Sequence, residues 1–365
     1  MHHTFTQSLA RTAFSSAFAL ALASLAACGG GGSDNPVAAT PTPTVPVSPP
    51  VTTPTPTPSP TPTPNGSVAP GIYVTNQNNS VTVFALDATG NAAPLRTLTG
   101  ASTNLALPIG MGVDHQGNLY VANRTGGTVT VYPSTANGNV APTRTIASPG
   151  MGSPQAVALG AGDDLYVATC PSCGGGNGGD TGVFHFAVNA TAADYTLSGS
   201  NTGFTVPVNV QLDKDKNVYV ANAFGGNVAV FAPGNSGNTL PIRSFTLNAG
   251  GNVQAMSLGA NSGANAIVLA VPGRGIQLYD TTASGPSNAA STLAPSGDFP
   301  LSYPAEVYFD NSVTPPVVYV NDYGAAAVYV IQTAGTAPNL TVASVKTIKG
   351  AATGLSSPLG ILVVH

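Results

Sequence analysis

A short sequence pattern recurs about every 49 residues along most of this 365-residue chain, and it constrains the fold more than any other feature. Each full copy holds an apolar residue, Tyr, Val and then two small or polar residues. The full copies begin at Ile72, Leu119, Leu165, Val218 and Val318, and a degenerate copy begins at Ala266. A repeat of this length cannot bury its apolar surface alone, so we expect the copies to pack against one another.

Four short apolar segments separated by turn residues make up each repeat. The Tyr segment is followed by a second alternating strand, such as Val81 to Phe84, and then by a Gly-Asn turn. The third segment begins with Arg in three copies, and this charge is expected to protect an outer strand from edge-to-edge pairing (Arg96, Arg144 and Arg243). The fourth usually begins with Pro, as in Pro108 to Asp114. Four strands repeated six times predict an all-β fold, a six-bladed β-propeller with four-stranded blades.

The order of the segments predicts how the ring closes. The repeats start at the Tyr73 strand and end with Pro358 to Val364, so the N-terminal and C-terminal strands should pair within one blade. The composition agrees, because 43 Gly and 32 Pro disfavour long helices and only 7% of the residues are charged. Ten Lys and Arg against 14 Asp and Glu give a net charge of −4, which argues against a nucleic-acid partner. We expect a monomeric propeller domain over residues 68–365.

The N-terminus resembles a bacterial lipoprotein signal. A small-apolar run from Ala13 to Leu25 ends in Leu25-Ala26-Ala27-Cys28, which has the form of a lipobox. The resemblance implies a signal peptide over residues 1–27, palmitate at Cys28 and a lipid anchor in the membrane. Gly29, where proteins retained at the inner membrane usually carry Asp, implies the outer membrane of a bacterial cell envelope. The alternative is an ordinary signal peptide with a chance Cys.

Residues 28–67 are expected to form a tether rich in Gly, Pro and Thr. Twelve of the 29 residues from Pro36 to Pro64 are Pro, a composition that favours the extended polyproline conformation. The segment therefore predicts a semi-rigid spacer between the anchor and the propeller. A Pro-rich ligand for a recognition domain is the alternative, although no basic residues flank the repeats.

Residues Pro108 to Val121 resemble the repeat of NHL propellers, Pro-x-Gly-Ile-x-x-Asp-x-x-Gly-Asn-x-Tyr-Val. The other copies match less closely. The resemblance implies the fold and no single activity, because related propellers include protein-interaction modules, gluconolactonase-type hydrolases and streptogramin lyases. The five His residues offer no Ser-His-Asp or Cys-His set on one face, and the paired His and Glu of the lyases is not found. We therefore favour a non-enzymatic function.

Two polar residues near the start of inner strands mark the centre of the ring. Glu306 is the only Glu in the chain, and Asn209 occupies the same position two repeats earlier. The simpler interpretation is a polar pair in contact with channel water, which needs no cofactor. Gluconolactonase-type propellers are similar in holding a divalent cation through carboxylates and Asn at this level. That resemblance implies, as an alternative, a Ca or Zn site at Glu306 and Asn209 in a lactonase-like hydrolase.

The loops after the Tyr segments are expected on the same face, which we call the mouth face. Arg124, Arg274, Asp322 and Tyr323 are the larger polar residues in these loops, and we predict that they contact a ligand. Asn residues in the loops suit left-handed turns. The predicted function is a surface-tethered propeller that binds a protein or a glycan through its mouth-face loops.

Cys170 and Cys173 lie in the longest of these loops and are predicted to form a disulfide, because an exported protein favours oxidised thiols. A redox catalyst would place the first Cys at the start of a helix, which the glycines of residues 174–179 cannot supply. A zinc site would have only His185 and Asp180 to complete it. Residues 175–180 also match one copy of a calcium-binding nonapeptide, a weak signal in isolation.

Overall fold

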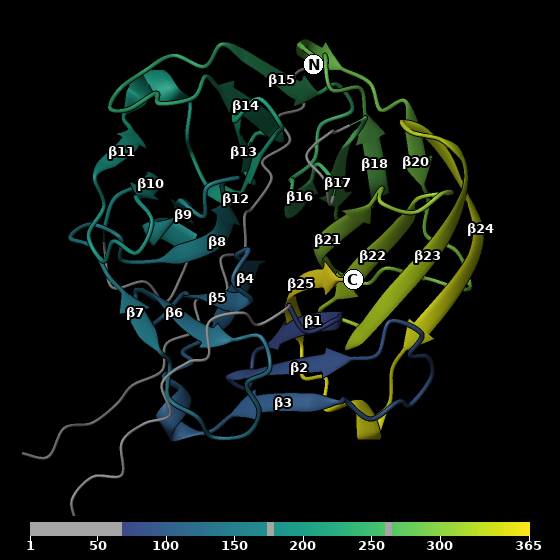
Figure 1. Ribbon diagram of the computed structural model, residues 1–365. Helices are drawn as coiled ribbons and strands as arrows, with labels where there is room; N and C mark the ends of the chain where they lie inside the picture. The colour runs from purple at the N-terminus through teal and green to yellow at the C-terminus, as the bar shows by residue number, and fades with distance from the viewer. Residues whose placement is uncertain (1–67, 174–178, 260–264) are drawn as a thin grey trace, which may run out of the picture. The chain divides into compact units, whose positions relative to one another are not determined.

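The computed structural model describes residues 68–173, 179–259 and 265–365. These residues form six β-sheets arranged around a common centre (Figure 1), which confirms the predicted six-bladed propeller. Within the described ranges no helix is long and apolar enough to cross a membrane. The lipobox with Cys28, the tether over residues 28–67 and most of residues 175–180 lie outside the described residues.

The blades are numbered along the chain, and their strands are given from the channel outward. Blade 1 contains β25 (Pro358–Val364), β1 (Gly71–Asn76), β2 (Ser80–Phe84) and β3 (Arg96–Thr99). Blade 2 contains β4 (Pro108–Val113), β5 (Asn118–Asn123), β6 (Thr128–Pro133) and β7 (Arg144–Ile146). Blade 3 contains β8 (Pro154–Leu159), β9 (Leu165–Thr169), β10 (Gly182–Phe186) and β11 (Tyr195–Ser198).

Blades 4 to 6 continue the same order. Blade 4 contains β12 (Pro207–Leu212), β13 (Val218–Asn222), β14 (Asn227–Phe231) and β15 (Arg243–Leu247), to which β19 (Gly285–Ser287) adds in parallel. Blade 5 contains β16 (Ala255–Ser257), β17 (Ile267–Val271), β18 (Gly275–Tyr279) and β20 (Ser291–Leu293). Blade 6 contains β21 (Pro304–Asp310), β22 (Val317–Asp322), β23 (Ala327–Thr336) and β24 (Asn339–Ile348).

Blade 1 closes the ring as predicted, since its innermost strand comes from the C-terminus. Antiparallel pairing places Ile72 opposite Val363 and Val74 opposite Ile361. Ile361 and Val363 are 6% and 3% exposed and pack in a core shared by blades 1 and 6. The first and last strands of the domain therefore join in one sheet and bury its seam.

Each blade packs both of its faces against neighbours, which explains why its middle strands are apolar at consecutive positions. In β5 every residue from Leu119 to Asn123 is buried. Tyr120 and Ala122 face a core shared with blade 3, whereas Leu119 and Val121 face one shared with blade 1. Because side chains alternate between the faces of a strand, a strand between two blades needs apolar residues in both phases.

The predicted Gly-Asn turns form, and they also join adjacent blades. Gly138 of blade 2 makes a parallel bridge with Leu98 of blade 1, and the Asn139 side chain accepts a hydrogen bond from the Ser102 backbone N–H at 2.8 Å. In the same way, the Asn91 side chain accepts a hydrogen bond from the Ala352 backbone N–H, and the Asn238 side chain accepts one from the Asn201 backbone N–H. The recurrence of Gly-Asn thus reflects contacts between blades as well as turn conformation.

The arginines of the outer strands have partners inside their own blades. Each guanidinium crosses the sheet and donates to the hydroxyl of the repeat Tyr, at 2.8 to 3.1 Å (Arg96 to Tyr73, Arg144 to Tyr120 and Arg243 to Tyr219). The guanidinium carbons also lie 5.5 to 5.8 Å from the ring centres, within reach of a cation–π interaction. These residues therefore tie the edge strand to the blade, in addition to the edge protection that the sequence predicted.

Blade 3 replaces this Arg–Tyr pair with a histidine cluster. His185 stacks on Tyr195 with ring centres 4.3 Å apart and meets Tyr166 edge-on at 4.7 Å. Its two ring nitrogens lie 2.7 Å from Asp194 and 3.2 Å from Asp164. His185 and Tyr195 stand in register where blades 1, 2 and 4 place Val and Arg, so the cluster secures the edge strand of blade 3.

Candidate ligand-binding site at the central channel

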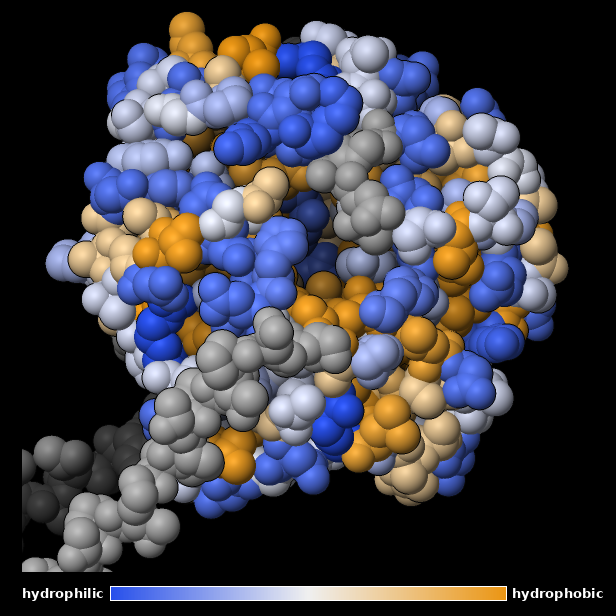
Figure 2. All heavy atoms as spheres, in the orientation of Figure 1, coloured by the Kyte–Doolittle hydropathy of each residue, from blue (hydrophilic) through white to orange (hydrophobic). Residues whose placement is uncertain are grey.

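Two pockets open on the central channel, one at each end of the inner strands. The mouth pocket, where these strands begin, has a volume of about 330 Å³, and the opposite cavity, where they end, has about 530 Å³. Both volumes lie in the range of small-molecule sites. Figure 2 shows the molecule hollowed near its centre. Glu306 lines both pockets and therefore marks the level at which they meet.

A ring of six residues, one from each blade, forms the wall of the mouth pocket. Each follows directly after the residue that opens the inner segment of its repeat, usually Pro (Ile109, Gln155, Val208, Gln254, Ala305 and Leu359). None of these six residues was among the predicted ligand contacts. Five of the inner strands carry a register shift just after their Pro, and such a bulge breaks the alternation of side chains. Comparing this one position across all repeats would have found the ring.

Arg124, Tyr303 and Tyr323 complete the mouth pocket from the loops. Tyr303 and Tyr323 meet edge-on with ring centres 6.0 Å apart, and the Tyr323 hydroxyl donates to Gln77 at 3.2 Å. Burial lowers the pKa of Arg124, and its Nε has no hydrogen-bond partner in the described part of the chain. Burial also raises the pKa of Tyr303, while nearby Arg124 opposes that shift. The structure thus brings the predicted Arg124 and Tyr323 together and adds Tyr303.

Asp322 lies beneath this pocket instead of lining it. Its side chain is fully buried and accepts hydrogen bonds from the backbone N–H groups of Tyr303 and Ala325, each at 2.9 Å, and from that of Ser302. The corresponding strands of blades 1, 2 and 4 end in Asn. Each of these Asn side chains likewise accepts a hydrogen bond from a backbone N–H of the loop that leads into the inner strand (Asn76, Asn123 and Asn222). Asp322 therefore positions Tyr303, which is the residue that lines the pocket at this point.

Arg274 lies apart from the pocket. It is exposed, and its guanidinium donates to the Ala249 carbonyl at 2.5 Å in the loop before blade 5. Among the four predicted loop residues, then, two line the pocket, one supports it from below and one lies away from it. The four residues differ in their place relative to the strand end. Arg124 and Tyr323 directly follow β5 and β22, Asp322 is the last residue of β22, and Arg274 lies three residues after the end of β17.

Glu306 and Asn209 meet across the channel, as their equivalent positions suggested. The Asn209 amide donates to the two carboxylate oxygens at 3.1 and 3.4 Å, and the Val307 backbone N–H donates to one of them at 3.3 Å. The two residues are 8% and 3% exposed. Burial raises the pKa of Glu306 well above its ordinary value, and the hydrogen bonds from Val307 and Asn209 oppose that shift.

The same pair supplies the oxygens that a cation would use. Within the described residues no group of three or more His, Cys, Asp and Glu comes together. A divalent ion at Glu306 would therefore take its remaining ligands from Asn209, backbone carbonyls and water. The predicted Ca or Zn site rests on these two side chains alone.

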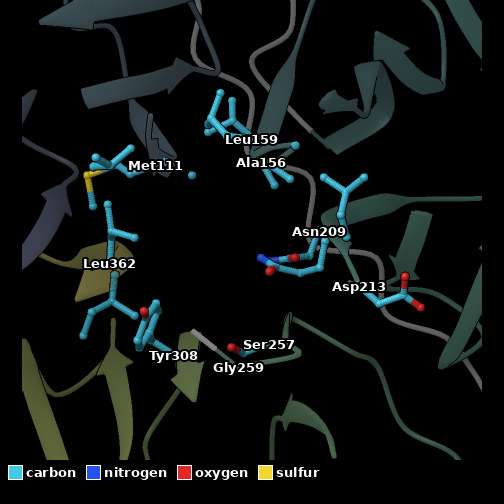
Figure 3. Close-up of a pocket in the computed structure, with 18 of the residues that line it drawn as sticks. Met111, Ala156, Leu159, Asn209, Asp213, Ser257, Gly259, Tyr308 and Leu362 are labelled. Atoms are coloured by element: carbon cyan, nitrogen blue, oxygen red, sulfur yellow. The ribbon is translucent and has the colours of Figure 1, made fainter. Parts of the chain in front are cut away.

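The opposite cavity is larger, and both apolar and polar side chains line it. Figure 3 shows its side chains around an open space, with Asn209 pointing into it from β12 and Leu362 and Tyr308 facing it from the other side. Met111 and Leu159 add to the apolar wall. At the outer rim His115 and Lys214 each lie 2.7 Å from an acidic partner, Asp163 and Asp215.

The predicted disulfide is present between Cys170 and Cys173, with their Cα atoms 5.4 Å apart. A single 3-10 turn, Pro171–Cys173, lies between β9 and the Gly-rich loop. Cys170 is fully buried against Val206 and Ala223 of blade 4. The bridge therefore closes a local turn at the start of the longest mouth-face loop, and the packing of Cys170 holds that turn against the neighbouring blade.

Comparison with protein-family models and with curated proteins gave no match. Solved structures match over most of the domain. A functionally unknown protein from Desulfotomaculum acetoxidans DSM 771 shares 12% identity at a TM-score of 0.53, covering 76% of this chain and 80% of its own. A protein of unknown function from Bacteroides caccae shares 11% identity at 0.52, covering 80% and 98%. Virginiamycin B lyase from Staphylococcus aureus shares 12% at 0.51, covering 80% and 86%. At these identities the likeness establishes the propeller fold alone.

Proposed function

We propose that this chain is a surface-tethered binding propeller that takes a glycan into its mouth pocket. The observation that carries the proposal is the convergence of Arg124, Tyr303 and Tyr323 from two different blades on one small pocket at the channel mouth. Three Gln side chains join them in the pocket, Gln77, Gln155 and Gln254. A small number of precisely placed polar groups around a concave site is typical of small-ligand recognition.

The chemistry of these side chains fits a sugar better than a flat protein surface. Tyr rings offer apolar faces to the C–H groups of a pyranose, and their hydroxyls remain able to hydrogen-bond. Amide and guanidinium groups bind pairs of neighbouring oxygens, and the unpartnered Nε of Arg124 is a donor that a ligand oxygen would satisfy. A volume of about 330 Å³ suits one or two sugar units.

Binding of purified domain to an immobilised glycan panel tests the proposal. Arg124→Ala and Tyr303→Ala should each weaken the binding of a hit at least tenfold, because both side chains line the pocket. Arg274→Ala is the matched control, since it removes the same charge from the same face without touching the pocket. A panel with no hit, or equal losses for the two Arg variants, would contradict glycan binding in this pocket.

A protein partner would give a different pattern. Its interface would spread over the rim, where Phe224 is 61% exposed at the tip of the β13–β14 loop. Phe224→Ala and Arg274→Ala would then weaken binding together with Arg124→Ala.

The competing function is a cation-dependent lactonase centred on Glu306 and Asn209, which the contact between their side chains supports. Elemental analysis of the purified protein separates the two. About one tightly held Ca or Zn per chain, lost in Glu306→Gln together with turnover of a lactone, would favour the enzyme. A chain that binds its glycan equally well after treatment with a chelator would favour the binding module.

A further inference from the structure

Unsatisfied hydrogen-bond acceptors mark the deep end of the opposite cavity. The Asn209 amide turns its NH₂ group toward the two carboxyl oxygens of Glu306 and its Oδ1 away from them. That Oδ1 is buried and has no hydrogen-bond partner within the described part of the chain. From the described residues, the Glu306 oxygens receive only the Asn209 amide and the Val307 N–H. Buried acceptors without donors are costly, so this position favours a ligand that brings N–H groups.

Glu306 also has no cation beside it, among the described residues, that would stabilise its ionised form. None of the ion pairs among the described residues includes Glu306, although the residue is more than nine-tenths buried. A buried carboxylate is most stable beside a cation that also donates hydrogen bonds. A primary ammonium supplies both, because it carries one positive charge and three donors.

Part of the cavity wall is apolar, and this part would contact an aliphatic body attached to the ammonium. Inner strands of five different blades contribute Met111, Leu159, Leu212, Val307 and Leu362 to the lining. With about 530 Å³ of space, the cavity has room for an apolar body of several carbon atoms between the rim and Glu306. Apolar surface removed from water against these walls is stabilising by about 25 cal/mol per Å².

We propose that the opposite cavity is a second binding site, distinct from the mouth pocket, for a primary amine with an apolar body whose ammonium reaches Glu306 and Asn209. Hexylamine is a suitable probe, and hexan-1-ol is its neutral counterpart of the same length. The chain contains no Trp, so Tyr308→Trp places a single fluorescent reporter in the cavity wall. Hexylamine should change the emission of this reporter and bind at least tenfold more tightly than hexan-1-ol.

Two variants test the assigned contacts. Glu306→Gln in the reporter background should abolish the preference for the amine, because the amide keeps the shape and removes the charge. Leu362→Trp, in the otherwise unsubstituted chain, should fill the cavity and remove the rise in melting temperature that hexylamine gives the parent protein. Arg274→Ala, which removes a charge outside both pockets, should leave both measurements unchanged.

Three results would overturn the proposal. Hexylamine and hexan-1-ol could bind with equal affinity, or Glu306→Gln could retain the preference for the amine. The third result is that hexylamine at concentrations up to about 10 mM changes neither the reporter emission nor the melting temperature of the parent chain. Such a result would mean that any complex has a dissociation constant above the millimolar range. The melting measurement uses the parent chain, so it decides the matter even if Tyr308→Trp does not fold.

Discussion

The closing strand of the ring allows the most direct test of how this domain is held together. Ile361 of β25 is 6% exposed and packs with Val74 of the paired strand and with Tyr319 and Val328 of blade 6. Replacing it by Ala removes three methyl or methylene groups at the seam where the first and last blades meet. We expect Ile361→Ala to lower the free energy of unfolding substantially.

The size of the loss follows from its burial. Large-to-small substitutions of buried Ile cost about 2–5 kcal/mol, the sum of lost transfer free energy and the cavity left behind. Unfolding entropy is about 2.1 cal/mol/K per residue, which for a domain of about 300 residues makes a loss of 3 kcal/mol equal to a fall in melting temperature of about 5 °C. That loss is a large part of the total stability of a typical domain.

Differential scanning calorimetry of the two chains measures this shift. Val342→Ala is the control, because Val342 lies in β24 with 38% of its surface exposed and should cost less than about 0.5 kcal/mol. Melting temperatures of Ile361→Ala and Val342→Ala that agree within error would refute the claim that β25 closes the ring through a buried seam.

Three further predictions address other parts of the chain. Burial raises the pKa of Glu306, so above about pH 4.3 the folded state holds a proton that the unfolded state has lost. The free energy of unfolding therefore falls as pH rises, by at most about 1.4 kcal/mol per pH unit, until the pH reaches the folded-state pKa. Glu306→Gln should therefore gain in melting temperature over the parent between pH 4 and pH 7, and an equal difference at both pH values would contradict this. Asn139→Ala should cost about 1 kcal/mol in urea unfolding by removing the contact to Ser102, whereas Asn139→Asp, which keeps an acceptor, should restore most of it. Cys28→Ala should release the protein from the membrane fraction and abolish palmitate labelling; unchanged partition would exclude the lipid anchor.

The sequence determined the architecture because the relevant information is local and repeated. Strand alternation, the Tyr segments and the Gly-Asn turns each recur within every 49 residues or so, and their order required Pro358 to Val364 to pair with the first strand. The Cys170–Cys173 bridge was predictable for the same reason, since its partners are three residues apart. Short-range patterns of this kind do not depend on how distant segments meet.

Only the tertiary structure decided which side chains share a pocket. Arg124 and Tyr303 are far apart in sequence and meet because blades 2 and 6 face the same opening, whereas Asp322 turned out to support the loop that carries Tyr303. The contact between Asn209 and Glu306 spans 97 positions and depends on the channel radius, which the repeat length does not specify. Bulges at the start of the inner strands turned the ring around Ile109 into the channel, against the alternation that a regular strand predicts. Side-chain direction at a strand end depends on such departures from regular geometry and on the neighbouring blades, and neither is encoded within a single repeat.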